Sequence, residues 1–224
     1  MLLKDRDVEY LLIRPKVPDR CKIVFLLHGF AQRASHMMNL IGKSIAKNIP
    51  NAYICSINGF HKCKGFEDRR RYDWLRYDGK IWDKNAIQHT ANKTSILLTG
   101  FIEDRLKEFN LAYKDFAFVG FSQGTRVSLH VALRMNQKCA GVLGYSGALS
   151  LPGMIADELK SKPQILLIHG DNDKILQPSE SILAANLLRN LGVQVDVNIL
   201  QNLEHTINKD GVELGIKFLR KIFS

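Results

Sequence analysis

Residues 115–132 read DFAFVGFSQGTRVSLHVA, and this stretch contains the pattern that decides the fold. It begins with a short apolar run, 116–119, whose length and composition are typical of a buried strand. The chain then turns through Gly-Phe-Ser-Gln-Gly and continues with apolar residues spaced to share one face of a helix. Those helical residues are Val127, Val131 and Met135. The stretch therefore predicts a strand, a sharp turn and a helix, with Ser122 at the turn.

A serine at so tight a turn has a specific chemical use. The residues two before and two after it, here Gly120 and Gly124, must be small so that strand and helix can pack closely beneath the hydroxyl. The backbone amide of the next residue then points at the same reacting atom as the hydroxyl. The Gly-x-Ser-x-Gly string alone occurs in many unrelated loops, but between a strand and a helix it is typical of the nucleophile elbow of an α/β-hydrolase. We therefore interpret Ser122 as a nucleophile.

The bulk composition is that of one ordinary globular domain, which we expect to span residues 1–224. Hydrophobic residues make up 46% of the chain, and no apolar run approaches the length of a membrane span. The N-terminal segment contains early acidic residues and does not resemble a secretory signal. Four cysteines without paired spacing indicate reduced thiols, so a cytoplasmic location is expected. They are Cys21, Cys55, Cys63 and Cys139.

The formal net charge of +10 raises the question of an anionic partner. The cations are spread along the chain, and the tight basic run is limited to residues 69–71. No RNA- or DNA-binding module accompanies it, so a solvated basic surface is favoured over a nucleic-acid role. A weak peripheral contact with anionic membranes stays open as an alternative.

Strands and helices are predicted to alternate along the chain. Strands are expected at 8–14, 22–27, 52–57, 116–119, 140–145, 164–168 and 193–200. Helices are expected at about 35–47, 85–110, after the elbow, 179–191 and 211–223, with Ser179 as an N-cap and Gly192 as a stop. The predicted fold class is therefore α/β, an α/β-hydrolase fold whose mostly parallel central sheet carries helices on both faces. The alternating strand at 193–200 is expected at an edge of that sheet.

Residues 58–84 interrupt this alternation. The stretch has little periodicity, many charges and several aromatic residues. Long irregular loops in compact domains are usually binding loops or lids, so we predict that this one lines a cleft. Trp74 and Leu75 are the candidate substrate-binding residues, and for Trp74 a purely structural anchoring role is an equal alternative.

An activated serine needs a histidine base and a carboxylate that orients the histidine. In an α/β-hydrolase these groups follow the serine in the order acid, then histidine, each just past the carboxyl end of a strand. Asp173 follows the strand at 164–168, and His205 follows the strand at 193–200. Asp171 is the alternative acid, although it is expected instead to hold the turn through hydrogen bonds to the backbone.

His205 is favoured over the other six histidines because of its position after the acid. His28 and His169 each precede a glycine at a strand end and are expected to be structural, and His130 lies on the elbow helix. The remaining three fall outside any strand-end loop that follows the acid. They are His36, His61 and His89.

The oxyanion formed during attack on a carbonyl needs two backbone amides. One belongs to Gln123, directly after the serine. The other is expected from the loop after the strand at 22–27, which assigns it to the N–H of Phe30.

The sequence resembles the phospholipase/carboxylesterase family of α/β-hydrolases, which includes acyl-protein thioesterases and small bacterial carboxylesterases. The matching elements are LLHGF at 26–30, GFSQG at 120–124, HGDND at 169–173, and His205 before the last helix. RRYDWL at 70–75 is similar to an Arg-x-x-Trp-Phe element of bacterial members. The family's acid matches Asp173. After His28-Gly29 the chain departs from the family pattern, which bears on the shape of the acyl pocket.

The resemblance implies hydrolysis of short- to medium-chain acyl esters or thioesters by a serine carboxylesterase, with no cofactor and no metal. The expected partner is a small acyl ester, thioester or lysophospholipid substrate, with the protein a monomer or homodimer and no nucleic acid bound. Two alternatives stay open: a lysophospholipase that acts at anionic membrane surfaces, and a non-catalytic binding protein with the same fold.

Overall fold

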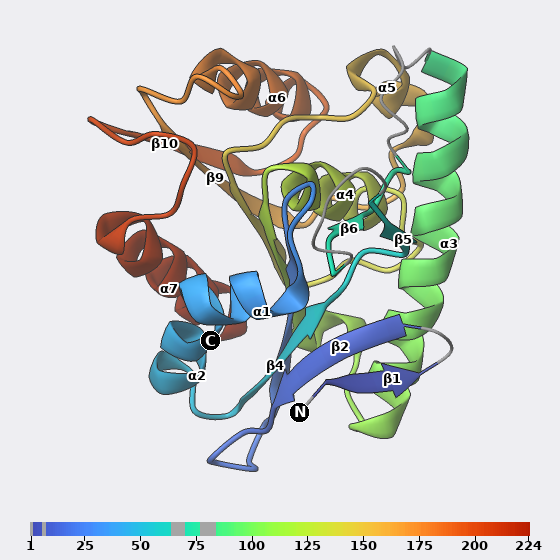
Figure 1. Ribbon diagram of the computed structural model, residues 1–224, viewed down its shortest axis with the longest axis vertical. Coiled ribbons are helices and arrows are strands. Elements are labelled where there is room, and N and C mark those ends of the chain that lie inside the picture. The colour runs from blue at the N-terminus through green and yellow to red at the C-terminus, as the bar shows by residue number, and fades with distance from the viewer. Residues whose placement is uncertain (1, 6–7, 64–69, 77–83) are drawn as a thin grey trace.

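The computed structural model describes residues 2–5, 8–63, 70–76 and 84–224 (Figure 1). Its centre is an eight-stranded sheet with the order β1-β2-β4-β3-β7-β8-β9-β10. The strands are β1 Leu3–Asp5, β2 Val8–Ile13, β3 Lys22–Leu27, β4 Ala52–Ile57, β7 Phe116–Phe121, β8 Gly141–Tyr145, β9 Gln164–Gly170 and β10 Val195–Leu200. The pairings of β2 with β1 and with β4 are antiparallel, and all others in this sheet are parallel. A separate two-stranded sheet joins β5, His61–Lys62, to β6, Tyr72–Asp73.

Helices cover both faces of the large sheet (Figure 1). They are α1 Ala34–Met37, α2 Lys43–Asn48, α3 Lys84–Glu108, α4 Gln123–Ala132, α5 Ile155–Glu158, α6 Pro178–Asn190 and α7 Lys209–Phe223. A π-helical turn, Met38–Gly42, joins α1 to α2, and 3₁₀ turns occur at Tyr113–Asp115 and Pro152–Met154.

Two hydrophobic cores follow from the side-chain alternation of the strands. In β3, Ile23 and Phe25 belong to the core under α3, α4 and α6, whereas Val24 and Leu26 belong to the core under α1, α2 and α7. Because both faces of a parallel strand are buried, the strand is apolar at successive positions and not only at alternate ones. The predicted mostly parallel sheet between two helical layers is confirmed.

One strand is not predicted and one local prediction is wrong. The unpredicted strand is β1, whose three residues pair with β2 at one edge of the sheet. Ser179 is not the N-cap of α6, because the helix begins at Pro178 and Gln177 occupies the cap. A proline suits the first helical position, since its fixed φ matches the helix and its missing N–H would have no partner there. Gly192 does follow the end of α6, with a φ of 76°.

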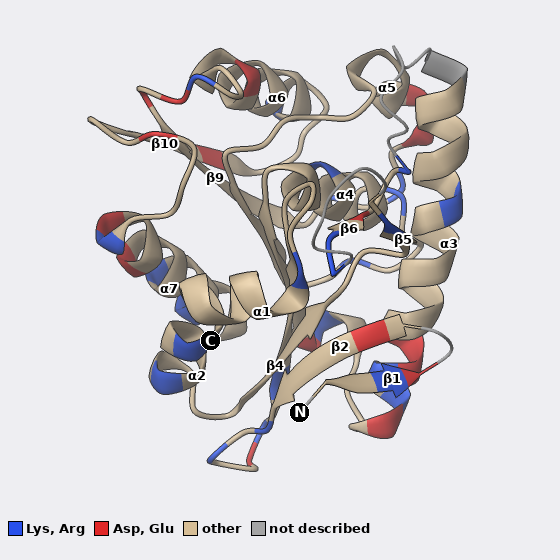
Figure 2. Cartoon of the chain, in the orientation of Figure 1, with Lys and Arg blue, Asp and Glu red and all other residues tan. Residues whose placement is uncertain are grey.

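Charged side chains are distributed over many elements, with basic residues on α2 and both acidic and basic residues on α7 (Figure 2). The edge position predicted for 193–200 is confirmed by β10, which ends the sheet order. Within the described residues, no helix combines the length and apolar character needed to cross a membrane.

His130 on α4 is buried without a hydrogen-bond partner. The residue is only 3% exposed, and neither ring nitrogen has a hydrogen-bond partner among the described residues. Burial, aided by the charge of Arg134 and opposed by Glu158, lowers the pKa of His130 to about 4. The unfolded chain, with a histidine pKa of about 6.5, therefore binds more protons than the folded chain as the pH falls from about 6.5 toward 4. His130 must lower the stability of the fold over that range.

We predict that His130→Leu stabilises the protein. Removing an unsatisfied buried polar group should raise the free energy of unfolding at pH 7 by about 1–2 kcal/mol. The loss of stability between pH 6.5 and 4 should also become smaller, which urea unfolding at pH 7 and pH 5 would measure. His89→Leu, on the exposed side of α3, is the matched control and should change neither quantity. Equal pH dependence in His130→Leu and the unmodified protein would contradict the prediction.

Candidate active site

Ser122 lies at the turn between β7 and α4 in a strained backbone conformation. Its φ is 53° and its ψ is −115°, a region that non-glycine residues rarely adopt. The turn is held at both ends, because Ser122 N–H donates to the carbonyl of Tyr145 at 2.9 Å and Thr125 N–H donates to the carbonyl of Ser122 at 3.0 Å. Strain of this kind persists only where the surrounding structure enforces it.

The two glycines of the turn are required by close packing. A Cβ atom on Gly120 would lie 2.5 Å from the amide nitrogen of Thr125. A Cβ atom on Gly124 would lie 2.1 Å from the carbonyl oxygen of Leu27, at the end of β3. Since β3 and β7 are neighbours in the sheet, α4 begins directly against the end of β3. The loop after β3 is thereby brought to the serine.

Asp173 and His205 meet in the loops that follow β9 and β10. His205 Nδ1 donates to Asp173 Oδ2 at 2.6 Å, and the other carboxylate oxygen accepts the amides of Ile175 and Leu176, each at 2.9 Å. Burial acts to raise the pKa of Asp173, but these backbone amides and His205 outweigh it and hold the pKa below its ordinary value. The buried carboxyl group therefore stays ionised.

The ring of His205 packs on the residue before the serine. Its centroid lies 4.9 Å from that of Phe121, and its side chain is 18% exposed. Because Nδ1 donates to Asp173, Nε2 is the nitrogen left to accept a proton. The loop that carries His205 is held close to β9, since a Cβ atom on Gly170 would lie 2.0 Å from the carbonyl oxygen of Leu203.

Asp171 does not hold the turn as predicted. Its side chain is exposed and has no hydrogen bond within the described part of the chain. The turn is instead held by Asp173, whose Oδ1 accepts the amides two and three residues on. The same carboxylate thus closes the turn and orients His205.

His169 contacts this carboxylate, a contact the sequence analysis does not predict. His169 is buried at the end of β9, with Nε2 3.1 Å from Asp173 Oδ2 and 2.8 Å from the carbonyl oxygen of Leu176. Both neighbours only accept hydrogen bonds, so Nε2 carries a hydrogen. Nδ1 lies 2.8 Å from the hydroxyl of Ser181 on α6. The i, i+4 spacing from Asp173 is the signal that could have suggested the contact.

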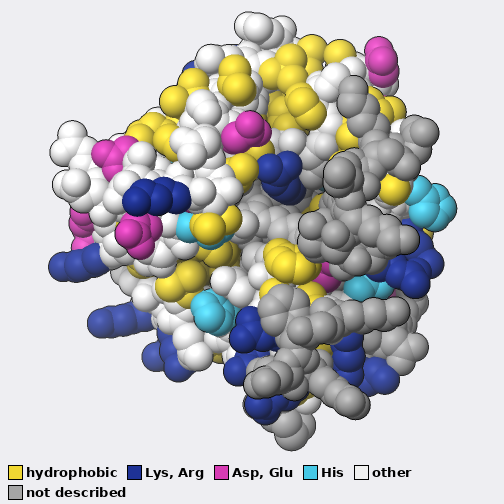
Figure 3. Space-filling model, turned by 45° about the horizontal axis from the view of Figure 1, so that its top comes forward, with side chains coloured by type: hydrophobic (Ala, Val, Ile, Leu, Met, Phe, Trp, Pro, Cys, Tyr) yellow, Lys and Arg dark blue, Asp and Glu magenta, His cyan; other side chains and the backbone are white. Residues whose placement is uncertain are grey.

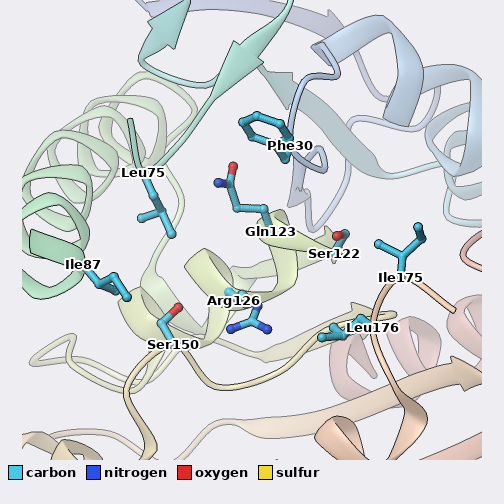
Figure 4. Close-up of a pocket in the computed structure, with 9 residues that line it drawn as sticks. All are labelled: Phe30, Leu75, Ile87, Ser122, Gln123, Arg126, Ser150, Ile175 and Leu176. Atoms are coloured by element: carbon cyan, nitrogen blue, oxygen red, sulfur yellow. The ribbon is translucent and has the colours of Figure 1, made fainter. Parts of the chain in front are cut away.

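The loop with Phe30 is fixed by His28. Nδ1 of His28 donates to the carbonyl of Gly29 at 2.7 Å, and Nε2 accepts the amide of Gly59 at 2.9 Å. Burial lowers the pKa of His28 to about 4, although its bond to Gly29 opposes the change, so the ring stays neutral. Gly29 N–H in turn donates to Gln32 Oε1 at 3.1 Å. Phe30 follows in this ordered loop and faces the same cavity as Ser122 (Figure 4).

Gln123, directly after the serine, ties α4 to the segment around β6. Its side chain accepts the amide of Trp74 at 3.1 Å and donates to Asp73 Oδ1 at 2.8 Å. Trp74 is fully buried, and its indole donates to the carbonyl of His28 at 2.9 Å. The structure therefore gives Trp74 a supporting position beneath the site and not the substrate contact proposed for it, whereas Leu75 lines the cavity.

A cavity of about 640 Å³ opens beside the serine. Its lining is Phe30, Leu75, Ile87, Ser122, Gln123, Arg126, Ser150, Ile175 and Leu176 (Figure 4). This face of the molecule is visibly hollowed, with hydrophobic side chains around the hollow (Figure 3). Residues 58–84 are predicted to line a cleft. The structure describes only part of this segment, because 64–69 and 77–83 lie outside the described residues.

The chain is similar to known hydrolases along nearly its whole length. It superimposes on the crystal structure of esterase PE8 with a TM-score of 0.89 at 28% identity, covering 98% of this chain and 100% of that one. The Bacillus cereus carboxylesterase gives a TM-score of 0.77 at 16% identity, covering 97% and 96%. The acyl-protein thioesterase 1 homolog 1 of Dictyostelium discoideum is 23% identical over 220 residues, which are 93% of this chain and 94% of that protein.

The fold and these similarities define the protein as an α/β-hydrolase and an enzyme of the serine hydrolase class. Residues 9–223 match the phospholipase/carboxylesterase family, and the chain belongs to that family. The resemblance noted from the sequence is thus confirmed.

We predict that Gly124→Ala destabilises the protein while Gly100→Ala does not. The added methyl group at 124 would collide with the carbonyl of Leu27, and overpacking of this kind costs about 1–3 kcal/mol. Gly100 lies within α3 with no heavy atom within 4 Å of an added Cβ, so alanine there should raise the free energy of unfolding by about 0.5–1 kcal/mol. Urea unfolding of both variants measures the difference, and similar stabilities would contradict the packing argument.

Proposed function

We propose that the protein is a serine carboxylesterase that hydrolyses short- to medium-chain acyl esters or thioesters through Ser122, His205 and Asp173. The observation that carries the proposal is the 2.6 Å bond between His205 and Asp173, formed beside a strained serine that lines an apolar cavity. We infer further that residues 1–224 act as one catalytic domain, which the family match over 9–223 supports.

The proposed mechanism has two halves that use the same base. His205 Nε2 takes the proton of the Ser122 hydroxyl as its oxygen attacks the carbonyl carbon, and Asp173 holds the imidazole in the required tautomer. The amides of Phe30 and Gln123 stabilise the negative oxygen of the tetrahedral intermediate. His205 then gives its proton to the departing alcohol or thiol, which leaves an acyl-enzyme. Water, activated by His205, hydrolyses that ester and frees the serine.

A lysophospholipase is the second candidate, favoured by a second cavity next to Phe30. This cavity of about 380 Å³ is lined by basic side chains, among them Arg33, Arg70 and Arg71. Such a lining suits an anionic leaving group such as the phosphate of a lysophospholipid. The non-catalytic alternative has little support, because such a protein has no need of a serine, a histidine and an aspartate at these three positions.

We predict that the protein hydrolyses chromogenic esters and that Ser122→Ala abolishes the activity. Loss of the nucleophile should lower kcat by several orders of magnitude, and a panel from acetyl to dodecanoyl esters would show which acyl lengths the cavity accepts. A fluorophosphonate probe should label the unmodified protein and not the variant. Faster turnover of a lysophospholipid on anionic than on neutral vesicles would favour the second candidate. If no substrate is hydrolysed and no probe reacts, the proposed function is wrong.

We predict that Asp173→Asn and Asp171→Asn differ sharply. Asparagine at 173 can no longer hold His205 in the required tautomer, so kcat should fall roughly 10³–10⁴-fold. Asparagine at 171 removes the same charge from an exposed side chain of the same turn, and kcat should change less than about twofold. Steady-state kinetics on one ester compares the two. A large loss in Asp171→Asn with little loss in Asp173→Asn would reverse the assignment of the acid.

A further inference from the structure

Arg126 places a positive charge in the wall of the cavity beside the serine. It lies in the first turn of α4, which begins directly after Ser122. Both line the cavity, whose remaining walls include the apolar side chains of Leu75, Ile87 and Leu176. A cation among apolar walls loses much of its hydration and needs a compensating partner.

Arg126 lacks such a partner within the described residues. No hydrogen bond or ion pair involves its guanidinium, and the acidic group that acts on it electrostatically, Glu180, is exposed on α6 beyond ion-pair distance. Two other partly buried arginines are both paired. Arg134 lies 2.5 Å from Glu158, and Arg105 lies 2.6 Å from Asp5.

Ser150 adds a second unused donor to the same cavity. Its hydroxyl oxygen is buried and has no hydrogen-bond partner among the described residues, although such groups are nearly always satisfied in folded proteins. The side chain of Arg126 extends between Ser150 and Leu176 (Figure 4). A guanidinium and a hydroxyl together form a donor set that suits a carboxylate, which accepts the two-pronged hydrogen bonds of arginine.

The cavity lies on the acyl side of the serine. His205 must give its proton to the leaving group, so the leaving group departs next to His205. His205 does not line this cavity, whereas Ser122 and the two residues assigned to the oxyanion hole do. The part of the substrate that enters the cavity is therefore the acyl chain.

We propose that Arg126, together with Ser150, selects acyl groups that end in a carboxylate, so that the preferred substrates are monoesters or monothioesters of short dicarboxylic acids. This inference rests on the proposed function. The methylene groups of such an acyl chain contact the apolar walls, and its terminal carboxylate replaces the water that the guanidinium and the hydroxyl lose. A neutral acyl chain of the same length leaves both donors unpaired.

The test compares two substrates that differ only in the terminal charge. These are the 4-nitrophenyl monoesters of dicarboxylic acids from glutaric to suberic acid, and the same compounds with the free carboxylate capped as a methyl ester. With the uncatalysed rate subtracted, the unmodified protein should show a kcat/KM at least about tenfold higher for the acid than for its capped partner at the best length. Arg126→Gln should remove that preference by lowering kcat/KM for the acid toward the value for its capped partner.

Three further variants sharpen the comparison. Arg126→Lys should keep part of the preference, because it retains the charge without the fork of donors. Ser150→Ala should reduce the preference less than Arg126→Gln does. Lys174→Gln removes an exposed cation from the turn beside Asp173 and should leave the preference unchanged.

The possible failures are distinguishable from one another. An unmodified protein that hydrolyses the capped esters as fast as the acids overturns the inference and leaves the proposed function intact. The inference also fails if Arg126→Gln keeps the preference, or if Lys174→Gln loses as much of it. Fluorophosphonate labelling of Arg126→Gln at the unmodified rate shows that Ser122 and its base are intact in the variant. Absence of both hydrolysis and labelling in the unmodified protein overturns the proposed function and the inference with it.

Discussion

The contact between the first turn of α4 and the end of β3 is the constraint on which the site depends. At Gly124 the helix approaches the carbonyl of Leu27 so closely that no side chain fits between them. This approach fixes three things together: the strained backbone of Ser122, the position of the following amide, and the proximity of the loop with Phe30. Glycine is thus needed at 124 because no larger residue allows α4 to lie this close to the end of β3. This requirement is separate from the conformational freedom that glycine gives the backbone.

A buried carboxylate is the second organising feature. Removing Asp173 from water is costly unless its oxygens are fully hydrogen-bonded, and four donors meet this requirement. They are His205 Nδ1, His169 Nε2 and the amides of Ile175 and Leu176. Three of the four come from β9 and the turn after it, and the fourth is donated by His205 from the loop after β10. Because β10 pairs with β9, the loops that carry Asp173 and His205 follow the ends of neighbouring strands.

The sequence predicts the parts of this structure that depend on neighbours along the chain. The strands at 22–27 and 52–57 agree with β3 and β4 at both ends, because continuous apolar runs between helices are characteristic of buried parallel strands. The prediction is weaker where tertiary contacts decide. Trp74 is aromatic in an irregular stretch, but only the folded chain reveals that its indole hydrogen-bonds to the strand end at His28. The shared cavity of Arg126 and Ser150 likewise joins residues far apart in the sequence, and no local pattern predicts that they meet.

Several residues in and beside α4 have strained or unsatisfied groups that lower the stability of the fold, and this helix also follows the proposed nucleophile. Arg126 and His130 lie one helical turn apart within α4, whereas Ser122 precedes the helix and Arg134 follows its end. Within the described part of the chain, Ser122 has a strained backbone, Arg126 an unpaired guanidinium, and His130 an imidazole with no hydrogen bond, whereas Arg134 is paired with Glu158. Of these four residues, the one farthest from the serine along the chain is therefore the one with a charged partner. The sheet beneath α4 is buried on both faces, and strained or unsatisfied groups of this kind persist only where the surrounding structure enforces them.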